Sequence, residues 1–471
     1  MTVVSRLRPV SRLLLTGLLA GAAGAFAQPA ARPPNFLIIL ADDLGAPELS
    51  CYGNTEHRTP HLDRLAREGT RFETCYATPI CSPTRVALMT GQYGFRTGWF
   101  NLIGSPYSPQ PNSPDYDVGA RLTFADVLKQ RGYATGLAGK WQLSGEPQTV
   151  IRDCGFDEYR MWAYLENLPA GEAHTGGYED KAKTKPARYW HPSIVENGKY
   201  RPTAPNDYGP DLFNEFVIDF MRRHQTRPFC IYYTSPLTHN PYLETPDPQN
   251  PGKRWPKGFK SNLEYLDHLV GRLVAAVDEL GLAQRTVILF LGDNGTAGRG
   301  KSEMSERGVR VPFIARGPGL VKPGVVSRAL TDITDVFPTL ADFAGATVPA
   351  NHPLDGRSLA PVLRGETDRH RDWIFSFRST GRLLRDQRWL LELDVEKGKE
   401  RFIDCGDRRD GVGYQDVTAS QAAEVLAARA RFEQILAGLP APGNRPGLIT
   451  PESNARKAAR AAKRAQPTKN N

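Results

Sequence analysis

The sequence predicts an α/β fold: a sandwich with a large, mostly parallel central sheet flanked by helices, followed by a small antiparallel C-terminal subdomain. Three observations favour this fold. Apolar runs typical of buried strands alternate with helical patterns over most of the chain. Acidic residues directly follow two of these runs, as they do at the carboxyl edge of a parallel sheet. Beyond residue 365 the alternation gives way to short strands.

The predicted strands coincide with largely apolar runs, which are typical of strands buried on both faces. The first predicted helix follows Thr59, which suits an N-cap, and begins with Pro60, which suits a first turn. Strands are expected at 35–41, 72–77, 133–138, 228–234, 287–291 and 311–315, and helices at 60–68, 122–130, 261–280 and 332–344. The C-terminal subdomain is expected to contain antiparallel strands at 372–377, 383–393 and 401–405 and a helix at 419–436.

Four segments are expected along the chain. They are a signal peptide at 1–27, a catalytic domain at 28–365, the antiparallel subdomain at 366–440 and a basic disordered tail at 441–471. The signal pattern consists of three arginines, an apolar run and the small-x-small triplet Ala25-Phe26-Ala27; an uncleaved anchor is the alternative. No later segment is long and apolar enough to span a bilayer. We therefore expect an exported protein, periplasmic or secreted, with no membrane contact after signal cleavage.

The net charge of +9 lies mainly at the two ends of the chain. Residues 1–27 carry +3 of it and residues 451–471 carry +5, so the body is close to neutral. A basic tail on a neutral domain is weak support for nucleic-acid binding, and no such partner is expected. The six cysteines are widely spaced and match neither a compact disulfide scaffold nor a zinc site.

Two long segments, 100–119 and 163–208, are rich in Pro, Gly, Tyr and Asn and are predicted to be loops. Loops of this length usually serve a functional site. We expect them, together with the C-terminal subdomain, to determine which substrate the protein accepts.

Polar residues follow two of the predicted buried strands. Asp42 and Asp43 come after the first, and Asp293 and Asn294 come after the strand at 287–291. Adjacent carboxylates repel one another unless a cation or a proton neutralises them. These oxygen ligands suit Ca²⁺ or Mg²⁺ better than Zn²⁺. Turn chemistry alone explains either cluster, but two acidic strand ends at one sheet edge favour a metal site.

The segment Cys81-Ser82-Pro83-Thr84-Arg85 is predicted to start a helix, because Pro83 suits a first turn. Cys81 would then lie at the helix N-terminus, where backbone N–H groups and the helix dipole favour an anion. Arg85 lies about one turn further on and can face the same pocket. A lone cysteine is more often a buried structural residue, so the helix position alone does not decide its role.

The chain resembles the type I sulfatases, which belong to the alkaline phosphatase superfamily. Cys-x-Pro-x-Arg is the motif that formylglycine-generating enzymes recognise in that family, and other family blocks follow in the family's order from residue 35 to about 365. These blocks are Gly139-Lys140-Trp141, His239-Asn240-Pro241, Gly300-Lys301 with Glu306-x-Gly308-Val309-Arg310-Val311-Pro312, Asp335-Val336-Phe337-Pro338-Thr339 and Asp355-Gly356-Arg357-Ser358-Leu359. Each block is weak by itself, but the ordered set is highly specific.

The resemblance implies an alkaline-phosphatase-like fold and a role for each matching residue. Cys81 would be oxidised to formylglycine, whose hydrate attacks sulfur and later expels sulfate. Lys140 and Lys301 would stabilise charge on the sulfate oxygens, Arg85 would anchor the hydrate, and His239 would donate to the leaving oxygen. The implied ligands of Ca²⁺, with Mg²⁺ as the alternative, are Asp42, Asp43, Cys81, Asp293 and Asn294.

Two positions depart from the family pattern. Gln142 stands where the family has a histidine to which a base role is assigned, and glutamine cannot accept a proton at neutral pH. Either the proton takes another route, or the enzyme is weakened. Arg307 stands where the family usually has glycine; it could contact an anionic substrate or point to solvent.

The expected function is hydrolysis of a sulfate ester, with a sulfated small molecule or glycan as substrate and a formylglycine-generating enzyme as partner during maturation. Two alternatives remain open. One is a phosphodiesterase or phosphonate monoester hydrolase of the same superfamily. The other is a sulfated-glycan-binding protein whose catalysis is impaired by Gln142.

Overall fold

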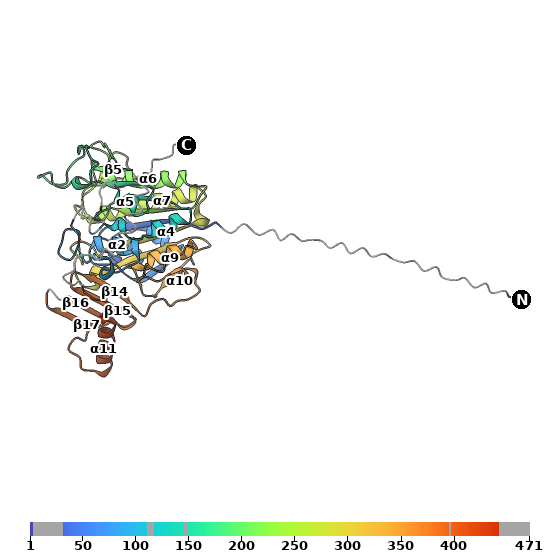
Figure 1. The fold of residues 1–471 in the computed structure, drawn as a ribbon, viewed down its shortest axis with the longest axis vertical. Coiled ribbons are helices and arrows are strands. Elements are labelled where there is room, and N and C mark those ends of the chain that lie inside the picture. The colour runs from blue at the N-terminus through green and yellow to red at the C-terminus, as the bar shows by residue number, and fades with distance from the viewer. Residues whose placement is uncertain (3–31, 111–116, 146–148, 395–396, 442–471) are drawn as a thin grey trace. The chain divides into compact units, whose positions relative to one another are not determined.

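The computed structural model describes residues 1–2, 32–110, 117–145, 149–394 and 397–441. The signal-peptide and tail predictions therefore lie almost entirely outside the described residues. From Pro33 onward the described residues form one compact unit (Figure 1). Within the described residues, no helix combines the length and the apolar character that crossing a bilayer requires.

The centre of the fold is an 11-stranded sheet in the order β12-β2-β11-β10-β1-β7-β3-β4-β5-β6, with β13 paired to β2. Its middle, from β10 through β1, β7 and β3 to β4, is parallel, whereas β11 runs antiparallel to both β10 and β2. The strands are β1 (Asn35–Ala41), β2 (Thr70–Tyr76), β3 (Ala134–Gly139), β4 (Glu158–Trp162), β5 (Ile194–Glu196), β6 (Lys199–Arg201), β7 (Phe229–Ser235), β10 (Thr286–Gly292), β11 (Arg310–Arg316), β12 (Val325–Ser327) and β13 (Thr331–Asp332). The predicted large, mostly parallel sheet is confirmed.

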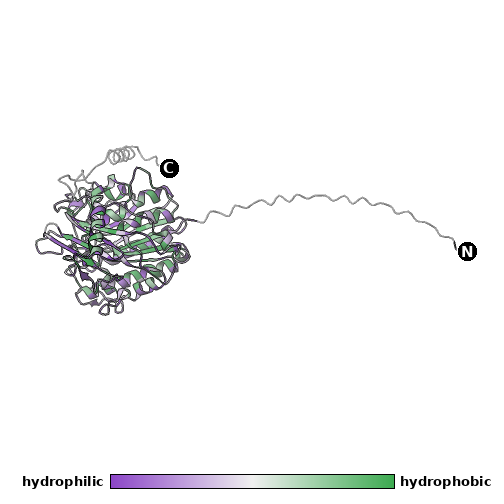
Figure 2. Cartoon of the chain, turned by 90° about the horizontal axis from the view of Figure 1, so that it is seen from below, coloured by the Kyte–Doolittle hydropathy of each residue, from purple (hydrophilic) through white to green (hydrophobic). Residues whose placement is uncertain are grey.

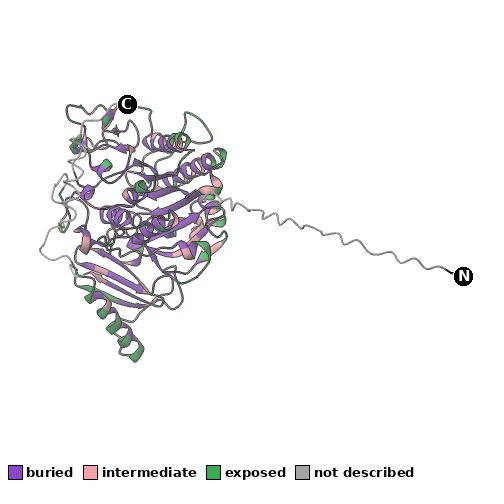
Figure 3. Cartoon of the chain, turned by 45° about the vertical axis from the view of Figure 1, so that its right-hand side comes forward, coloured by how far each residue is buried: buried purple, intermediate pink, exposed green. Residues whose placement is uncertain are grey.

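Helices cover both faces of this sheet, because its strands are apolar on both sides. In β1, for example, Phe36 and Ile38 belong to one hydrophobic core, and Leu37 and Ile39 belong to the other. Figures 2 and 3 show this arrangement as hydrophobic, buried central strands beneath helices whose outer faces are exposed. The longer helices are α1 (Pro60–Arg67), α2 (Cys81–Thr90), α4 (Phe124–Gln130), α6 (Gly209–Arg223), α7 (Phe259–Glu279) and α9 (Val336–Phe343).

Short elements lie in the connections between these strands and helices. The short helices are α3 (Gly94–Thr97), α5 (Val150–Asp153), α8 (Glu306–Val309) and α10 (Ala360–Arg364). The 3₁₀ turns are η1 (Ala46–Glu48), η2 (Ser50–Tyr52), η4 (Val118–Ala120), η5 (Leu165–Asn167), η6 (Ala283–Arg285) and η7 (Ile333–Asp335), and a two-stranded ribbon joins β8 (Thr245–Pro246) to β9 (Arg254–Trp255).

The C-terminal sheet is antiparallel throughout, as predicted. Its order is β14 (Trp373–Arg378), β15 (Gly381–Asp386), β16 (Trp389–Asp394), β17 (Lys399–Asp404) and β18 (Gln415–Asp416), and α11 (Ala423–Ala437) follows it. Arg385 on β15 is fully buried, and its Nη1 lies 2.7 Å from Oε1 of Glu306 on α8. This ion pair attaches the C-terminal sheet to the segment that follows Lys301.

Some predicted elements differ from the observed ones. Residues 383–393 are not one strand but parts of β15 and β16, because the Asp386 side chain accepts hydrogen bonds from the backbone N–H groups of Arg388 and Trp389 and closes a hairpin. The segment 163–208 is not wholly a loop, because β5 and β6 extend the central sheet. Sequence reasoning also missed α6, although Phe213, Phe216 and Phe220 have helical spacing.

Candidate active site

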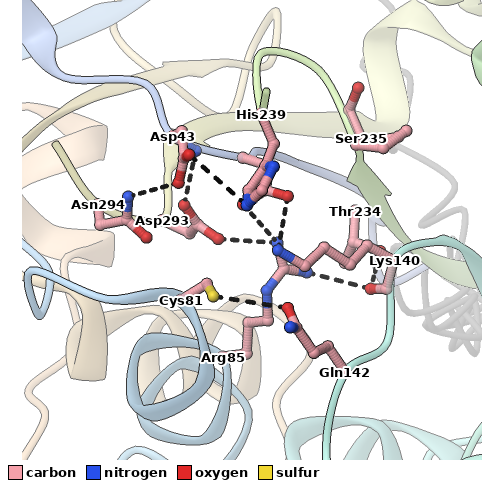
Figure 4. A network of polar contacts seen from close by, with 12 residues as sticks. Asp43, Cys81, Arg85, Lys140, Gln142, Thr234, Ser235, His239, Asp293 and Asn294 are labelled. Atoms are coloured by element: carbon pink, nitrogen blue, oxygen red, sulfur yellow. Dashed lines mark hydrogen bonds and ion pairs between the residues drawn. The ribbon is translucent and has the colours of Figure 1, made fainter. Parts of the chain in front are cut away.

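Four neighbouring strands of the central sheet end side by side and bring the sequence-predicted site residues together. Ala41 of β1 lies opposite Gly292 of β10 and Ser235 of β7, and Gly139 of β3 lies opposite Thr234. The segments that carry Asp42, Asp43, Lys140, His239, Asp293 and Asn294 leave the sheet at this edge, and α2 adds Cys81 and Arg85 (Figure 4). The structure thus gathers residues that are far apart in the sequence.

Three carboxylates at this edge are matched by three cations. Nζ of Lys140 lies 2.7 Å from Oδ2 of Asp42, and Nη2 of Arg85 lies 2.8 Å from Oδ2 of Asp293. Nζ of Lys301 lies 2.7 Å from the carboxylate of Asp43. The carboxylates have no exposed surface, and Lys140 and Arg85 are each 1% exposed. Because buried charges are stable only when they are paired, each cation is needed where it lies.

The backbone at this edge is shaped by one obligatory glycine and by several strained residues. A Cβ on Gly139, whose φ is +101°, would lie 2.0 Å from the carbonyl oxygen of Thr234, so only glycine fits before Lys140. Asp43, Gln142 and Ser302 also have positive φ, at 59°, 51° and 68°. Strained conformations of this kind cluster at functional sites.

Burial and charge act in opposite directions on the three carboxyl groups. Burial raises the pKa of Asp293 to about 7, and Asp42 adds to the rise. Burial and the neighbouring Asp42 also raise the pKa of Asp43. Burial alone would raise the pKa of Asp42 as well, but Lys140, His239 and Arg85 outweigh it and hold that pKa well below its usual range. Asp42 is therefore the carboxylate most firmly held as an anion.

Two oxygen atoms at the site accept no hydrogen bond from the described residues. They are Oδ1 of Asp42 and Oδ1 of Asn294, and both are buried. Nδ2 of Asn294 donates to Asp43 at 2.9 Å, which fixes the orientation of the amide. One ligand atom each from Asp42, Cys81 and Asp293 lie within 4.8 Å of one another. The carboxylate oxygens of Asp42 and Asp293 and the amide oxygen of Asn294 are hard ligands, which fit a divalent cation such as Ca²⁺ or Mg²⁺.

Cys81 is the first residue of α2, as the sequence predicts. Cys81 is buried, with 2% of its surface exposed, and its Sγ lies 3.6 Å from Oε1 of Gln142. Among the described residues, no side chain caps the helix, so its first N–H groups are available to an anion. Burial raises the pKa of the Cys81 thiol despite nearby Lys140, which keeps an unmodified cysteine here protonated.

His239 lies in a segment that hydrogen-bonds directly to the backbone of Asp42. The N–H of Asp42 donates to the Leu237 carbonyl at 2.9 Å, and the N–H of Thr238 donates to the Asp42 carbonyl at 2.6 Å. Nε2 of His239 points toward the site and lies 3.8 Å from Oδ2 of Asp43. The imidazole therefore faces the same space as Lys301 and the carboxylates.

Arg188 is a contact of His239 that sequence reasoning missed. Its Nη1 lies 3.0 Å from Nδ1 of His239, and its Nε lies 2.8 Å from Oε1 of Glu179. The guanidinium also stacks over Trp162, at 4.3 Å from the ring centroid. Burial is the main cause that lowers the pKa of His239 to about 2; Asp42 acts in the opposite direction, and Lys140 and Arg188 add to the lowering. The only sequence signal was that Arg188 lies in a long segment expected to serve a site.

A further cavity of the described residues lies away from this site. It has a volume of about 980 Å³ and is lined by none of the residues proposed from the sequence for catalysis or metal binding. A smaller cavity of about 170 Å³ adjoins the site through Gln142 and is otherwise lined mainly by apolar side chains, including Trp141, Leu143 and Met161. The chemistry of its residues, and not cavity size, identifies the candidate active site.

Comparison with known proteins shows the family to which the chain is similar. The family model described as Sulfatase matches residues 34–346. The chain is 35% identical to arylsulfatase A of Homo sapiens, over 87% of this chain and 81% of that protein. It is 33% identical to steryl-sulfatase of Mus musculus, over 80% and 72%, and 31% identical to N-acetylgalactosamine-6-sulfatase of Canis lupus familiaris, over 77% and 72%.

Solved structures give the same result for the fold. The crystal structure of Ps i-CgsB in complex with k-i-k-neocarrahexaose superposes with a TM-score of 0.69 at 25% sequence identity. The match covers 86% of this chain and 92% of that chain.

The buried pair of Arg188 and Glu179 provides a test of the site's scaffold. Their side chains are 8% and 4% exposed, so Arg188→Met leaves the Glu179 carboxylate buried without its cationic partner, although the backbone N–H of residue 188 still donates to it. We expect the free energy of unfolding in denaturant to fall by about 3–5 kcal/mol. The double variant Arg188→Met/Glu179→Leu should recover much of that loss.

Arg223→Met is the matched control for this test, because Arg223 is 41% exposed and pairs with Glu158 at the surface. It should cost no more than about 1 kcal/mol. Equal losses in the single variant and the double variant would show that the ion pair is not what makes Arg188 important for stability.

Proposed function

The chain belongs to the sulfatase family and is a sulfate-ester hydrolase, and we propose that it acts on a sulfated carbohydrate with formylglycine made from Cys81 as its nucleophile. The fold is the alkaline-phosphatase-like sandwich that the sequence predicts. The observation that carries the proposal is the position of Cys81, at an uncapped helix N-terminus beside two lysines, an arginine and unpartnered oxygen ligands.

The site residues fit the group that the family forms from cysteine. The hydrated aldehyde supplies a geminal diol, in which one hydroxyl attacks sulfur and the other allows sulfate to be released. The first N–H groups of α2 and the Gln142 amide, whose Oε1 lies 3.6 Å from Sγ of Cys81, would contact the oxygens of this group. Arg85, held by Asp293 and by the Lys140 carbonyl, is positioned to anchor these oxygens.

Lys140 and Lys301 are the groups proposed to bind the sulfate oxygens. Each donates to a carboxylate, and each retains further N–H donors for a ligand. Burial lowers the pKa of Lys301, but Asp43 and the other acidic groups nearby together raise it above its usual range, so this side chain remains a cation through the neutral range. In a buried site, fixed cations stabilise charge that develops on oxygen far better than water does.

A divalent cation, Ca²⁺ or Mg²⁺, would be held by Asp42, Asp43, Asp293 and Asn294, with an oxygen from the modified residue 81 as a further ligand. When bound, it polarises the sulfate and favours ionisation of an attacking hydroxyl. The unpartnered oxygens of Asp42 and Asn294 support this assignment. Ca²⁺ is the preferred ion, because it accepts many oxygen ligands in flexible geometry.

His239 is proposed to donate a hydrogen bond or a proton to the leaving oxygen. Its Nε2 faces the site, and the Arg188 guanidinium donates to Nδ1, which fixes the ring orientation and leaves the ring proton on Nε2. Gln142 can orient a hydroxyl through its amide, but it does not remove a proton. Proton transfer in this chain therefore depends more heavily on His239 than on the residue at position 142.

The substrate class rests on the relatives. N-acetylgalactosamine-6-sulfatase is named for a sulfated sugar, and the Ps i-CgsB structure holds a neocarrahexaose. We further propose that residues 1–27 direct export, which would bring the enzyme to such substrates, and that a formylglycine-generating enzyme acts on Cys81 during maturation. Aryl sulfates serve as generic test substrates.

The nucleophile is tested by mass spectrometry of the peptide that contains Cys81, together with turnover of an aryl sulfate. We expect active native protein to carry an aldehyde at residue 81, and Cys81→Ala to abolish turnover while leaving the fold intact. Cys51→Ala is the matched control, because Cys51 is also a free cysteine but lies outside the site. Active protein with only an unmodified thiol would overturn the mechanism, and faster turnover of an aryl phosphate diester would favour a phosphodiesterase.

Metal binding predicts a stability change that can be measured without turnover. After treatment with EDTA, adding Ca²⁺ at about 100 times its dissociation constant should stabilise the protein by about 2.7 kcal/mol. The corresponding rise in melting temperature should be lost in Asp43→Asn, which removes a carboxylate ligand. Asp278→Asn, at a carboxylate 35% exposed on α7, should retain the full shift. If Ca²⁺ raised the melting temperature of Asp43→Asn as much as that of the wild type, the metal would bind elsewhere.

Position 142 provides a test of the proton route. Gln142→His restores a group that can accept a proton, and general base catalysis typically contributes about 10²–10⁴-fold. We expect kcat to rise for an alkyl sulfate, and a new ionisation to appear in its pH profile. Gln142→Asn is the control, because it keeps the amide but gains no base. A fall in kcat for Gln142→His would show instead that the glutamine amide itself is required.

A further inference from the structure

Two adjoining cavities lie away from Cys81, at the junction between the catalytic sheet and the C-terminal region. Their volumes are about 980 and 490 Å³, and they share Tyr52, Gly53, Arg310 and Asp410. We call the two cavities together the arginine groove. One wall is formed by η1, η2 and the turn after them, and another by residues between β17 and β18.

The smaller cavity is lined by more cations than anions. It contains five arginines and no lysine against three carboxylates; the arginines are Arg71, Arg310, Arg328, Arg408 and Arg409, and the carboxylates are Glu73, Asp407 and Asp410. The use of arginine alone is informative, because the guanidinium fork matches the oxygens of sulfate, phosphate and carboxylate groups.

The three carboxylates pair with only two of these arginines. Asp410 lies 2.7 Å from Arg408, and the longer contacts of Arg328 are with Glu73 at 3.8 Å and with Asp407 at 3.9 Å. Within the described residues, no carboxylate lies within 4.0 Å of the other three guanidinium groups, which belong to Arg71, Arg310 and Arg409. The smaller cavity thus holds three cations without a counterion.

Two of the unpaired arginines are buried. Arg310 is 6% exposed and donates only to backbone carbonyls, those of Glu73 and Asp410. Arg409 is 7% exposed, and its Nε has no hydrogen-bond partner within the described residues. Burial lowers the pKa of Arg409, and the neighbouring cations Arg385 and Arg328 lower it further. Buried cations without a counterion are costly, so a bound anion would relieve an existing strain.

Arg71 and Arg307 continue the cationic surface outward from these buried groups. The guanidinium of Arg71 lies 4.7 Å from the centroid of the Tyr52 ring, which holds it in place by a cation–π contact. Arg307 is exposed, lines the larger cavity and has no carboxylate partner within the described residues. It also stands where the family pattern has glycine, so this part of the groove is a property of this chain.

We propose that the arginine groove binds a sulfate group of a polysulfated chain, outside the catalytic pocket. The identity of this ligand rests on the proposed function, whereas the need for an anion does not. The groove is large for a single inorganic ion, because binding sites of about 300–1,000 Å³ hold drug-sized ligands. A chain that carries several sulfate groups would place one group on Arg71, Arg310 and Arg409 and would extend past Arg307.

The experiment measures binding of a dextran sulfate oligosaccharide by calorimetry, with neutral dextran as the blank. Arg71→Gln and Arg409→Gln should each weaken the affinity about tenfold, because each removes charge-assisted hydrogen bonds. Arg71→Lys keeps the positive charge but loses the forked guanidinium group. Its affinity for the oligosaccharide should therefore fall between that of the wild type and that of Arg71→Gln. Aryl sulfate turnover should stay unchanged in all three variants.

Arg222→Gln is the matched control. Arg222 is 58% exposed on α6, which lies at the other end of the molecule from β14–β17 in Figure 1. The Arg222→Gln substitution removes the same unit of charge as Arg71→Gln, and it should leave the affinity for the oligosaccharide unchanged. Equal losses in Arg222→Gln and Arg71→Gln, or no loss in either groove variant, would overturn the proposal. Because Arg409 is buried, circular dichroism accompanies its variant, and Arg71→Gln provides the result if that variant unfolds.

Further ligands identify the anion and separate this proposal from the catalytic one. Competition by millimolar inorganic sulfate as effective as the oligosaccharide would overturn a site for a chain, and so would equal affinity for a carboxylated polysaccharide. The protein could release no sulfate and still lose oligosaccharide binding in Arg71→Gln. That result would support the groove and contradict only the proposed hydrolysis of a sulfated carbohydrate.

Discussion

The rest of the site depends on the pairing of three buried carboxylates with three cations at one edge of the central sheet. Asp42, Asp43 and Asp293 are fully buried, and a buried carboxylate without a partner would take up a proton or destabilise the fold. Their partners come from α2, from the end of β3 and from the segment before α8. Charge pairing therefore explains why segments so distant in the sequence must meet here, and it places the proposed nucleophile, at the start of α2, among them.

The same pairing shapes the proton chemistry. His239 lies beside Lys140, Lys301 and Arg188, and these cations together with burial keep its imidazole un-ionised. An un-ionised imidazole can still donate a hydrogen bond through one nitrogen. In the proposed mechanism, Gln142 adds no proton acceptor, so the family's acid–base pair would be reduced to His239, whose position is set by Arg188 and Glu179.

Sequence reasoning predicted the parts of the site that local patterns determine. The acidic residues after β1 and β10 follow from strand burial, and the position of Cys81 follows from the helix signal at Pro83. It could not predict Arg188, because no spacing within 163–208 shows which residue reaches His239. The arginine groove was inaccessible for the same reason. Arg71 lies on β2 and Arg409 lies between β17 and β18, and only the packing of the C-terminal sheet brings them together.

The two groups of cations in this protein differ in one respect that separates their functions. Those at the catalytic edge are already matched by carboxylates, so a sulfate that enters there competes with Asp42 and Asp43 for the same N–H groups. Additional positive charge, such as a divalent cation, is needed to favour the sulfate. Three of the arginines in the groove have no carboxylate to compete with. Capture of a polyanion in the groove would therefore weaken with added salt but not with metal removal, whereas chemistry at residue 81 would depend on the metal.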